Sequence, residues 1–294
     1  MPPQILAAGR ICRDELLELQ DWPLPDSKTH LKASLETVGG NAARAALCAA
    51  HLGAEVCLAG RVGDDAAGRF CLERLTAAGV DTGLVRIIPG GRTPHSHVLV
   101  CGPSRTVLAE TSALKPLELD EGLRAAARGA DVMLLDPAAA HLAEDLKRLG
   151  GAQLIYDHEP AAYNQTRLFE LADWFVPGLG SLNIRRGLAK ALVALSERVA
   201  GRLVVTAGAR GAYFRTAEGF KLVEAPDVAA RDTTGAGDNF HGALAVALGR
   251  GFSLEQAVSF AVAVASLSCI SLGCTPPDSN EASALAGQLR LSAV

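Results

Sequence analysis

The chain has 294 residues, of which 49% are hydrophobic and 20% are charged, so it can bury a substantial core and is not intrinsically disordered. Its net charge of −4 gives no reason to expect nucleic acid or an anionic membrane as a partner. The seven cysteines are scattered and contain no Cys-x-x-Cys pair, which indicates neither a zinc site nor a disulfide framework and predicts a reducing, cytoplasmic location.

The first half of the chain mixes strands and helices. An apolar segment at 5–11 predicts a buried strand. We then expect, in chain order, strands at 14–19 and 30–37 around a proline-rich turn, a helix at 41–52, a strand at 55–59, a helix at 66–78, and strands at 96–100 and 106–110.

From residue 120 onward, helices alternate with short apolar strands. The expected pairs are helix 121–128 with strand 132–135, helix 141–149 with strand 153–156, helix 167–171 with strand 174–176, and helix 188–199 with strand 203–205. Such alternation predicts an α/β fold with a mostly parallel sheet covered by helices on both faces, and ligands bind at the carboxyl ends of such strands. The strands between 14 and 37 and between 96 and 110 do not fit this alternation, so we expect them to form a small separate sheet.

No membrane segment is expected. The N-terminus lacks the basic region and long apolar core of a signal peptide. The most apolar segment, 257–274, is interrupted by four serines and predicts a buried helix.

The run RDTTGAGDNF at 231–240 is the most informative in the chain. Gly235 and Gly237 lack a Cβ and let the backbone approach a ligand closely, and the apolar segment 239–248 predicts a helix whose first N–H groups face that ligand. Asp238 brings a carboxylate to the same place. An anion-binding loop beside a carboxylate suits phosphoryl transfer to a hydroxyl. A glycine turn with Asp238 as a helix-start charge is the alternative.

The complete run resembles the second signature of the ribokinase-like (PfkB) family of sugar and nucleoside kinases, Asp-Thr-Thr-Gly-Ala-Gly-Asp-x-Phe. The resemblance implies that Asp238 is the catalytic base. It also implies that Gly235, Ala236 and Gly237 form the anion hole for the transferred phosphoryl group.

A second run, GGNAAR at 39–44, opens the helix at 41–52 and resembles the first signature of the same family. The resemblance implies that Gly39, Gly40 and Asn41 contact the acceptor sugar, and an amide suits hydroxyl recognition because it both donates and accepts hydrogen bonds. A simple N-cap role for Asn41 is the alternative. Arg44 and Arg105 are further candidate contacts for the acceptor.

Two aspartates of the early strands complete the expected acceptor site. Family members place an aspartate after the first strand, where it accepts hydrogen bonds from two sugar hydroxyls, and this role falls on Asp14. Asp26 is similar to a lid aspartate that ketohexokinase donates across its dimer. An exposed loop carboxylate is the alternative interpretation of Asp26.

The expected nucleotide site follows strand 203–205. Thr206, Gly208 and Gly211 match a family Thr-x-Gly-x-x-Gly that lines the ATP site, and the resemblance adds Thr234 and the glycines of the 231–240 run. A hairpin turn after the strand is the alternative, and both can hold together.

Two ion sites are expected. Asp157 and Glu159 are candidate Mg²⁺ ligands at alternate positions after a strand, with solvated charges as the alternative. Many family members carry Pro-Asn-x-x-Glu after the next strand, but the matching run PGLGS at 177–181 lacks the amide and the carboxylate. Asp232 and Thr234 resemble the part of ribokinases that helps to hold K⁺. Four histidines lack metal-ligand spacing and are not expected to be ligands: His95, His97, His158 and His241.

The resemblance covers essentially the whole chain. It implies a ribokinase-like three-layer α/β/α sandwich, with a single catalytic domain over 1–294 and β-lid excursions at 12–37 and 92–113. A lid of this kind closes over the sugar and often pairs between subunits, which predicts a homodimer.

The expected activity is ATP- and Mg²⁺-dependent phosphorylation of a sugar hydroxyl. In motif detail the chain is most similar to sulfofructose kinases and ketohexokinases, and the lack of a cation directly after strand 132–135 favours a neutral sugar such as a ketohexose. A 2-keto-3-deoxy sugar acid, a sugar phosphate, a sulfosugar or a nucleoside is the alternative acceptor. A non-catalytic sugar- or nucleotide-binding protein is a second alternative. A dinucleotide oxidoreductase is disfavoured, because no Gly-x-Gly-x-x-Gly follows the first strand.

Overall fold

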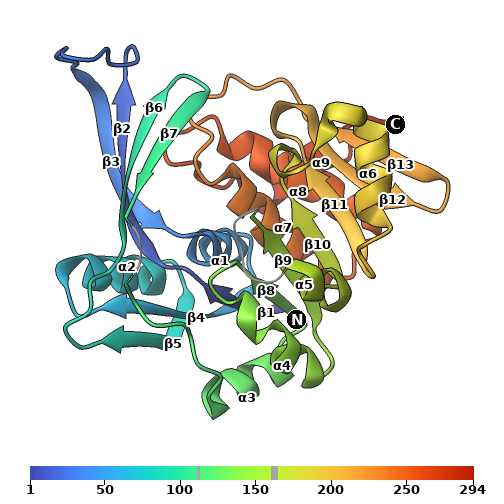
Figure 1. Ribbon diagram of the computed structural model, residues 1–294, viewed down its shortest axis with the longest axis horizontal. Coiled ribbons are helices and arrows are strands. Elements are labelled where there is room, and N and C mark those ends of the chain that lie inside the picture. Colours follow the sequence, from blue (N-terminus) through green and yellow to red (C-terminus); the bar gives the residue numbers. More distant parts are fainter. Residues whose placement is uncertain (111–112, 160–164) are drawn as a thin grey trace.

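The computed structural model describes residues 1–110, 113–159 and 165–294, which form two sheets of different size (Figure 1). The large sheet has ten strands in the order β14-β13-β12-β11-β10-β9-β8-β1-β4-β5, and the small sheet has four in the order β3-β2-β6-β7. The predicted α/β fold with a small separate sheet is confirmed.

The strands of the large sheet are β1 (Gln4–Gly9), β4 (Glu55–Gly63), β5 (Val80–Ile88), β8 (Val132–Leu135), β9 (Gln153–His158), β10 (Trp174–Pro177), β11 (Arg202–Thr206), β12 (Gly211–Thr216), β13 (Gly219–Glu224) and β14 (Leu291–Ala293). Those from β5 to β11 in the sheet order are parallel, whereas β12, β13 and β14 add an antiparallel edge.

The helices are α1 (Asn41–His51), α2 (Ala66–Ala77), α3 (Glu121–Gly129), α4 (Ala143–Arg148), α5 (Gln165–Leu171), α6 (Leu188–Ser196), α7 (Ala236–Gly249), α8 (Leu254–Ser268) and α9 (Ser279–Ala286). Several begin at side-chain caps, which supply acceptors to N–H groups that have no partner within the helix. Asp65 caps α2, Asp120 caps α3, and Ser253 forms a capping box with Gln256 at the start of α8.

Both faces of the large sheet are buried, as the alternation along β1 shows. Ile5 and Ala7 belong to a core cluster that includes residues of α1, α7 and α8, whereas Leu6 and Ala8 belong to a second cluster with residues of α3 to α6. Successive side chains of a strand point to opposite faces. The sheet is therefore the middle layer of a three-layer sandwich.

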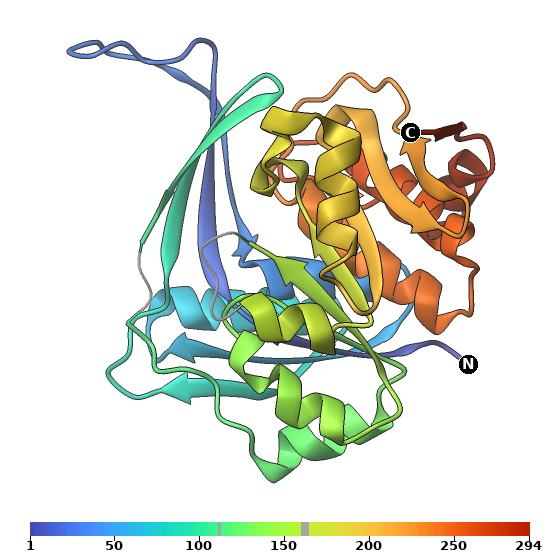
Figure 2. The same ribbon diagram turned by 45° about the vertical axis from the view of Figure 1, so that its right-hand side comes forward.

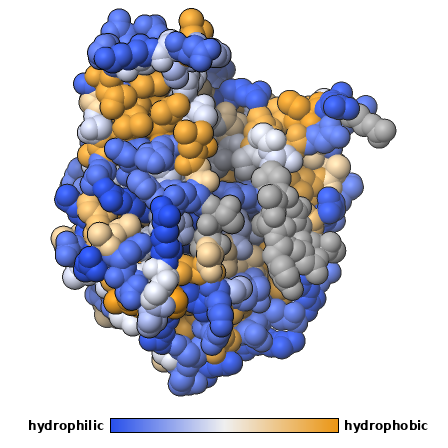
Figure 3. Space-filling model, turned by 60° about the vertical axis from the view of Figure 1, so that its left-hand side comes forward, coloured by the Kyte–Doolittle hydropathy of each residue, from blue (hydrophilic) through white to orange (hydrophobic). Residues whose placement is uncertain are grey.

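The small sheet consists of β2 (Cys12–Leu19), β3 (Leu31–Gly39), β6 (His95–Cys101) and β7 (Ser104–Ala109), and we call it the lid. It rises from one end of the large sheet and leans out from the body (Figures 1 and 2). Apolar side chains gather on the lid in Figure 3. The large apolar side chains that its strands expose are Leu31, Leu35, Val107 and Leu108.

The expected elements did not include β5, β12, β13, α9 and β14, although a hairpin turn after strand 203–205 was the alternative there. The strand β5 is at the edge of its sheet and carries polar and exposed side chains, so its sequence lacks the apolar run of a central strand. Segment 257–274 contains most of α8, which is buried almost throughout, as expected. Within the described residues, every helix is too short or too polar to cross a bilayer.

Candidate active site

The start of α7 lies at the centre of the candidate site. Gly235 is the N-cap, with a left-handed φ of 82°, and α7 begins at Ala236, three residues earlier than the sequence predicted. A Cβ at Gly237 would meet no atom within 4 Å, so this position faces open space. The first N–H groups of a helix have no intrahelical acceptor, and they are available to an anion at this end.

Arg44 packs directly behind this loop. A Cβ at Gly235 would lie 1.9 Å from Nε of Arg44, so only glycine fits there. Nη2 of Arg44 donates to the carbonyl oxygens of Thr234 and Gly273, at 2.8 Å each. Arg44 is buried, and its guanidinium therefore joins the loop before α7 to the loop after α8.

Asp238 lies in the first turn of α7 and forms an ion pair with Arg44. Its Oδ2 is 3.6 Å from Nε of Arg44, and the exposed fractions of the two side chains are 16% and 7%. Burial, and next the nearby Asp157 carboxylate, raise the pKa of Asp238 to about 7, although Arg44 and His241 act in the opposite direction. A carboxylate with this pKa can both accept and release a proton near neutral pH.

A second carboxylate faces Asp238 from the end of β9. Oxygen and nitrogen atoms of Asp157, Asp238 and His241 all lie within 4.8 Å of one another. Nε2 of His241 is 3.5 Å from Oδ1 of Asp157. The sequence interpretation missed His241, although it lies three residues after Asp238 and so on the same side of α7.

Asn41 connects α1 to the same acidic group. Its Nδ2 donates to Oδ2 of Asp157 at 2.8 Å and to Oε1 of Glu159 at 3.0 Å. Asn41 is not the N-cap, because Gly40 takes that position. A Cβ at Gly40 would lie 2.3 Å from the carbonyl oxygen of Arg10, which explains glycine at this close approach.

Asp14 reaches the site from the lid. It is buried, accepts a hydrogen bond from Sγ of Cys12 at 3.3 Å, and interacts with the side chain of Ser96. Burial raises the pKa of Asp14. A Cβ at Gly39 would lie 2.2 Å from its carboxyl group, so the glycine leaves room for this carboxylate.

Asp136 is a positioning residue that the sequence interpretation did not identify. It follows β8 and is buried, and its carboxylate accepts hydrogen bonds from the backbone N–H groups of Arg10, Ala42 and Ala138. These bonds join the ends of β1 and β8 to the first turn of α1. Burial raises the pKa of Asp136 to about 6. An acidic residue directly after a buried strand was the available signal.

The lid contacts the loop before α7. Nη2 of Arg231 is 2.7 Å from Oε2 of Glu18 on β2, and Nη1 of Arg105 donates to Oγ1 of Thr233 at 2.7 Å. Arg105 therefore binds the loop in this structure. These contacts hold the lid against the loop before α7.

Four further residues were expected at the site from the sequence: Thr206, Gly208, Gly211 and Asp26. Thr206 ends β11 and is half-buried, and Gly208 adopts a φ of 57° in a turn beside it. A Cβ at Gly211 would lie 1.9 Å from the carbonyl oxygen of Val223, so packing within the β12–β13 hairpin is sufficient to require this glycine. Asp26 is exposed in the connection between β2 and β3.

The carboxylates around Asp157 fit a magnesium ion. Mg²⁺ prefers oxygen ligands and retains several waters, so one or two carboxylates suffice to hold it. Asp157 and Glu159 lie on one side of Asn41, and Asp238 approaches Asp157 from α7.

The oxygens of Asp232 and Thr234 already accept hydrogen bonds within the protein. The two carboxylate oxygens of Asp232 accept hydrogen bonds from the N–H groups of Thr234 and Gly273, each at 2.8 Å. The carbonyl oxygen of Thr234 accepts from Arg44. A cation at the carbonyl oxygen of Thr234 would lie beside the guanidinium and be repelled by it.

Comparison with known proteins agrees with this arrangement. The model of the pfkB family of carbohydrate kinases matches residues 4–281. The chain is 28% identical over 272 residues to a ribokinase of Bacillus subtilis (strain 168), which covers 89% of this chain and 92% of the relative. It is 29% identical over 279 residues to an ATP-dependent ribose-1-phosphate kinase of Halopiger xanaduensis, with coverages of 90% and 91%.

Solved structures show the same fold. The ribokinase of Arabidopsis thaliana in complex with ribose and ATP superposes with a TM-score of 0.81 at 23% identity, over 97% of this chain and 99% of that one. Ribokinase from Giardia lamblia gives a TM-score of 0.84 at 20% identity, with coverages of 97% and 99%.

The family match covers residues 4–281, which include the loop before α7, the glycines before α1 and the lid. Phosphoryl transfer to a hydroxyl is the activity of these kinases, and the sequence-based interpretation as a phosphotransferase is confirmed. The chain belongs to the pfkB family of carbohydrate kinases and is a ribokinase-like sugar or nucleoside kinase.

Proposed function

We propose that this protein transfers the γ-phosphoryl group of ATP to a hydroxyl of a small neutral sugar, such as a ketohexose, in one domain of residues 1–294 whose lid comprises 12–37 and 92–113. The observation that carries the proposal is the ion-paired Asp238 at the open N-terminus of α7. Curated relatives named ribokinase, ribose-1-phosphate kinase and nucleoside kinase support a hydroxyl-bearing acceptor.

Asp238 is the proposed base. Its carboxylate takes the proton of the attacking hydroxyl, the hydroxyl oxygen forms a bond to the γ-phosphorus, and the bond from that phosphorus to the β–γ bridging oxygen breaks to release ADP. The N–H groups of Gly235, Ala236 and Gly237 would offset the negative charge of the transferring group, and that of Ala236 would exchange its 3.3 Å hydrogen bond to the carbonyl oxygen of Thr233 for the phosphoryl group. A bound Mg²⁺ near Asp157 and Glu159 would neutralise phosphate charge.

The acceptor is proposed to lie between the lid and α1. Asp14 accepts hydrogen bonds from sugar hydroxyls, and the backbone of Gly39 and Gly40 offers further polar groups. Both amide hydrogens of Asn41 are engaged by Asp157 and Glu159, so its Oδ1 is the atom available to a hydroxyl. The lid excludes water, which would otherwise compete as acceptor.

The nucleotide is proposed to lie along the ends of β10 and β11. Thr206 and Gly208 are placed there, and Gly178 is bridged to Thr206. Gly178 and Ser181 stand where many family members have an amide and a carboxylate, so a bound ion would depend more on the Asp157 carboxylate.

We propose that Arg44, and not a potassium ion, supplies the fixed positive charge behind the phosphate loop. The guanidinium is buried and bound to Thr234 and Gly273, and it pairs with Asp238. Arg44 was expected to contact the acceptor. The contacts it makes with the protein favour a positioning role instead.

One observation favours a second candidate acceptor, with an anionic group. A cavity of about 480 Å³ lies at the ends of β1 and β4, and Arg10, Arg61 and Lys115 are among its lining residues. Nε and Nη1 of Arg61 are buried without a hydrogen-bond partner among the described residues. A phosphate or carboxylate of the acceptor would pair with such a cation.

A homodimer through the lid and a cytoplasmic location complete the proposal. The exposed apolar side chains of the lid strands suit a second copy of the chain, and Asp26 at the lid tip would then approach a partner's site. All seven cysteines are free, as a reducing compartment requires.

The test is a coupled ADP-release assay with MgATP over neutral pentoses and ketohexoses, sugar phosphates, sugar acids and nucleosides. Neutral sugars that give the highest kcat/KM support the main proposal, and anionic acceptors that do so support the second candidate. Release of ADP from no acceptor, in a protein that still binds ATP, would instead identify a non-catalytic binding protein. The Asp238→Asn protein is the matched control for contaminating kinases.

A further inference from the structure

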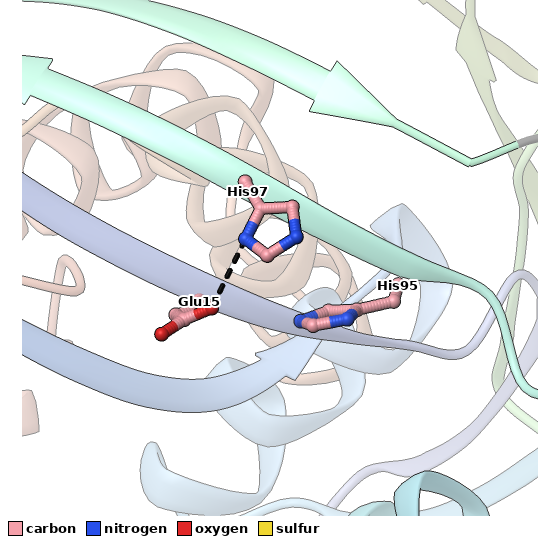
Figure 4. Close-up of side chains that lie close together, drawn as sticks. All are labelled: Glu15, His95 and His97. Carbon is pink, nitrogen blue, oxygen red and sulfur yellow. Dashed lines mark ion pairs between the residues drawn. The ribbon is translucent and has the colours of Figure 1, made fainter.

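The lid carries two imidazoles and a carboxylate on the face opposite to Asp14. Glu15 on β2 and His97 on β6 are register partners, and His95 lies two residues before His97. Residues two apart on a strand point to the same side, so the three side chains project from one face of the lid (Figure 4). The intervening Asp14 and Ser96 are buried on the other face.

The three side chains are close enough to share one ion. One ligand atom from each lies within 4.8 Å of those from the other two. Oε2 of Glu15 is 3.0 Å from Nδ1 of His97, and the centroids of the two imidazole rings are 4.6 Å apart. Two donors bound tetrahedrally to one Zn²⁺ at about 2.0–2.2 Å are roughly 3.3 Å apart. The Glu15–His97 spacing is close to that value, and a small rotation would bring His95 to it.

An ion pair provides partners for only two of the three side chains. Glu15 and His97 contact each other, but Nε2 of His95 is buried and has no hydrogen-bond partner in the part of the chain that the structure describes. A buried ring nitrogen without a partner is unfavourable. A metal bound at this nitrogen would satisfy it.

Charged residues of both signs lie near the cluster. Arg13 is the register partner of His95, and its guanidinium pairs with Glu36 and lies over the ring of Phe70. Glu36 is also the register partner of Glu15 on β3. Two carboxylates, Glu15 and Glu36, therefore lie near Arg13, and a second guanidinium, that of Arg74, also lies over Phe70.

We propose that Glu15, His95 and His97 form a site for a divalent transition-metal ion of the zinc class, with water in the remaining coordination positions. Two imidazoles and one carboxylate suit Zn²⁺, whereas Mg²⁺ prefers an all-oxygen set. The ion would tie β2 to β6 directly behind Asp14 and so fix the strand that carries this carboxylate. The proposal concerns the lid alone and does not depend on the identity of the acceptor.

The test measures the zinc content and zinc affinity of the full-length protein after removal of metal with a chelator. The wild-type protein should bind one equivalent at the lid, and His95→Ala and His97→Ala should each bind it at least tenfold more weakly. His30→Ala is the matched control, because His30 is an exposed lid histidine outside the cluster, and it should bind as the wild type does.

A further variant separates the lid from the catalytic end. Asp157→Asn removes a carboxylate of the other carboxylate–histidine cluster, and it should retain the lid equivalent. Zinc binding that is lost in Asp157→Asn but kept in both histidine variants would overturn the proposal, as would no binding by the wild type.

Cobalt gives a test that needs no variant. Co²⁺ added to the wild-type protein should produce the visible absorption of a four- or five-coordinate ion with nitrogen ligands, and one equivalent of Zn²⁺ should abolish it. A spectrum that remains that of hydrated Co²⁺ would contradict the site.

Discussion

The start of α7 contains a buried ion pair, whereas the lid contains an exposed one. The Arg44–Asp238 pair is almost enclosed, and the guanidinium is also bound to two backbone carbonyls. On the lid, Arg13 and Glu36 form a pair whose side chains are 27% and 48% exposed. A buried pair is strongly coupled to its surroundings, whereas an exposed pair contributes little free energy. The catalytic end is therefore a rigid and specific arrangement, and the lid is a surface that can be adjusted.

The comparison predicts its largest effect at Asp238. Asp238→Asn keeps the size of the side chain but cannot accept the hydroxyl proton, so kcat should fall by about 10²–10⁴-fold. The affinity for ATP should change little, because the anion hole is made of backbone groups. Initial rates of ADP release and calorimetric titration with ATP measure the two quantities. Turnover close to the wild-type value would refute the role of this carboxylate.

Arg44→Met should have the next largest effect. It leaves Asp238 and two carbonyl oxygens without their buried cation, which should lower the free energy of unfolding by roughly 3–5 kcal/mol. Urea unfolding of the two proteins measures the difference. The matched control is Arg13→Met, since that arginine is in the exposed lid pair, and its loss of stability should be about 1 kcal/mol or less.

The wild-type protein tests the ion requirement. Wild-type kcat should not depend on K⁺ at constant ionic strength, because the guanidinium already supplies the charge. Strong activation of the wild type by K⁺ but not Na⁺ would contradict the assignment of Arg44.

Asp14 lies on the lid and faces the catalytic end. Its substitution should weaken binding of the acceptor. Asp14→Asn loses charge-assisted hydrogen bonds to sugar hydroxyls, worth roughly 1.5–3 kcal/mol, so KM for the sugar should rise about 10–100-fold. The KM for ATP should stay near the wild-type value, which steady-state kinetics with each substrate varied in turn will show. An equal rise in both constants would mean that Asp14 supports the fold and not the acceptor.

The pH dependence of kcat/KM should follow the ionisation of Asp238. Burial raises its pKa to about 7, so the reactive carboxylate form is lost as pH falls below that value. We expect a tenfold decrease in kcat/KM per pH unit on the acid side and a plateau above it. In Arg44→Met the midpoint should move upward, because Arg44 lowers this pKa. A flat profile between pH values of about 5 and 8 would exclude a base with this pKa.

The smallest effect is expected where the lid meets the loop. Arg231→Gln breaks the ion pair with Glu18, in which the arginine side chain is 48% exposed and the glutamate 14%, and ion pairs at the surface contribute about 0.2–1 kcal/mol. The rate should therefore fall less than about sixfold, and the difference should vanish at high salt. A loss as large as that of Asp14→Asn would mean that lid closure, and not acceptor contact, limits the reaction.

Local patterns were sufficient for much of the fold and for the centre of the site. Alternating helices and apolar strands predicted the parallel sheet, and the 231–240 run placed Asp238 at a helix start. These signals act within a few residues of each other, so a single sequence contains them.

Contacts between distant residues could not be predicted in this way. Arg44 binds Thr234 across 190 positions, and Asn41 binds Asp157 across 116. His95 and His97 show no metal spacing on their own, because the third member of their cluster, Glu15, comes from another strand. In each case only the tertiary fold brings the partners together.

The most direct test of the account is one distance in a crystal structure with the acceptor and a non-hydrolysable ATP analogue. The account predicts that the attacking hydroxyl oxygen lies about 2.6–3.2 Å from a carboxylate oxygen of Asp238, while other hydroxyls contact Asp14. An acceptor whose hydroxyls all lie beyond hydrogen-bond reach of Asp238, with the γ-phosphate away from the α7 N-terminus, would contradict it.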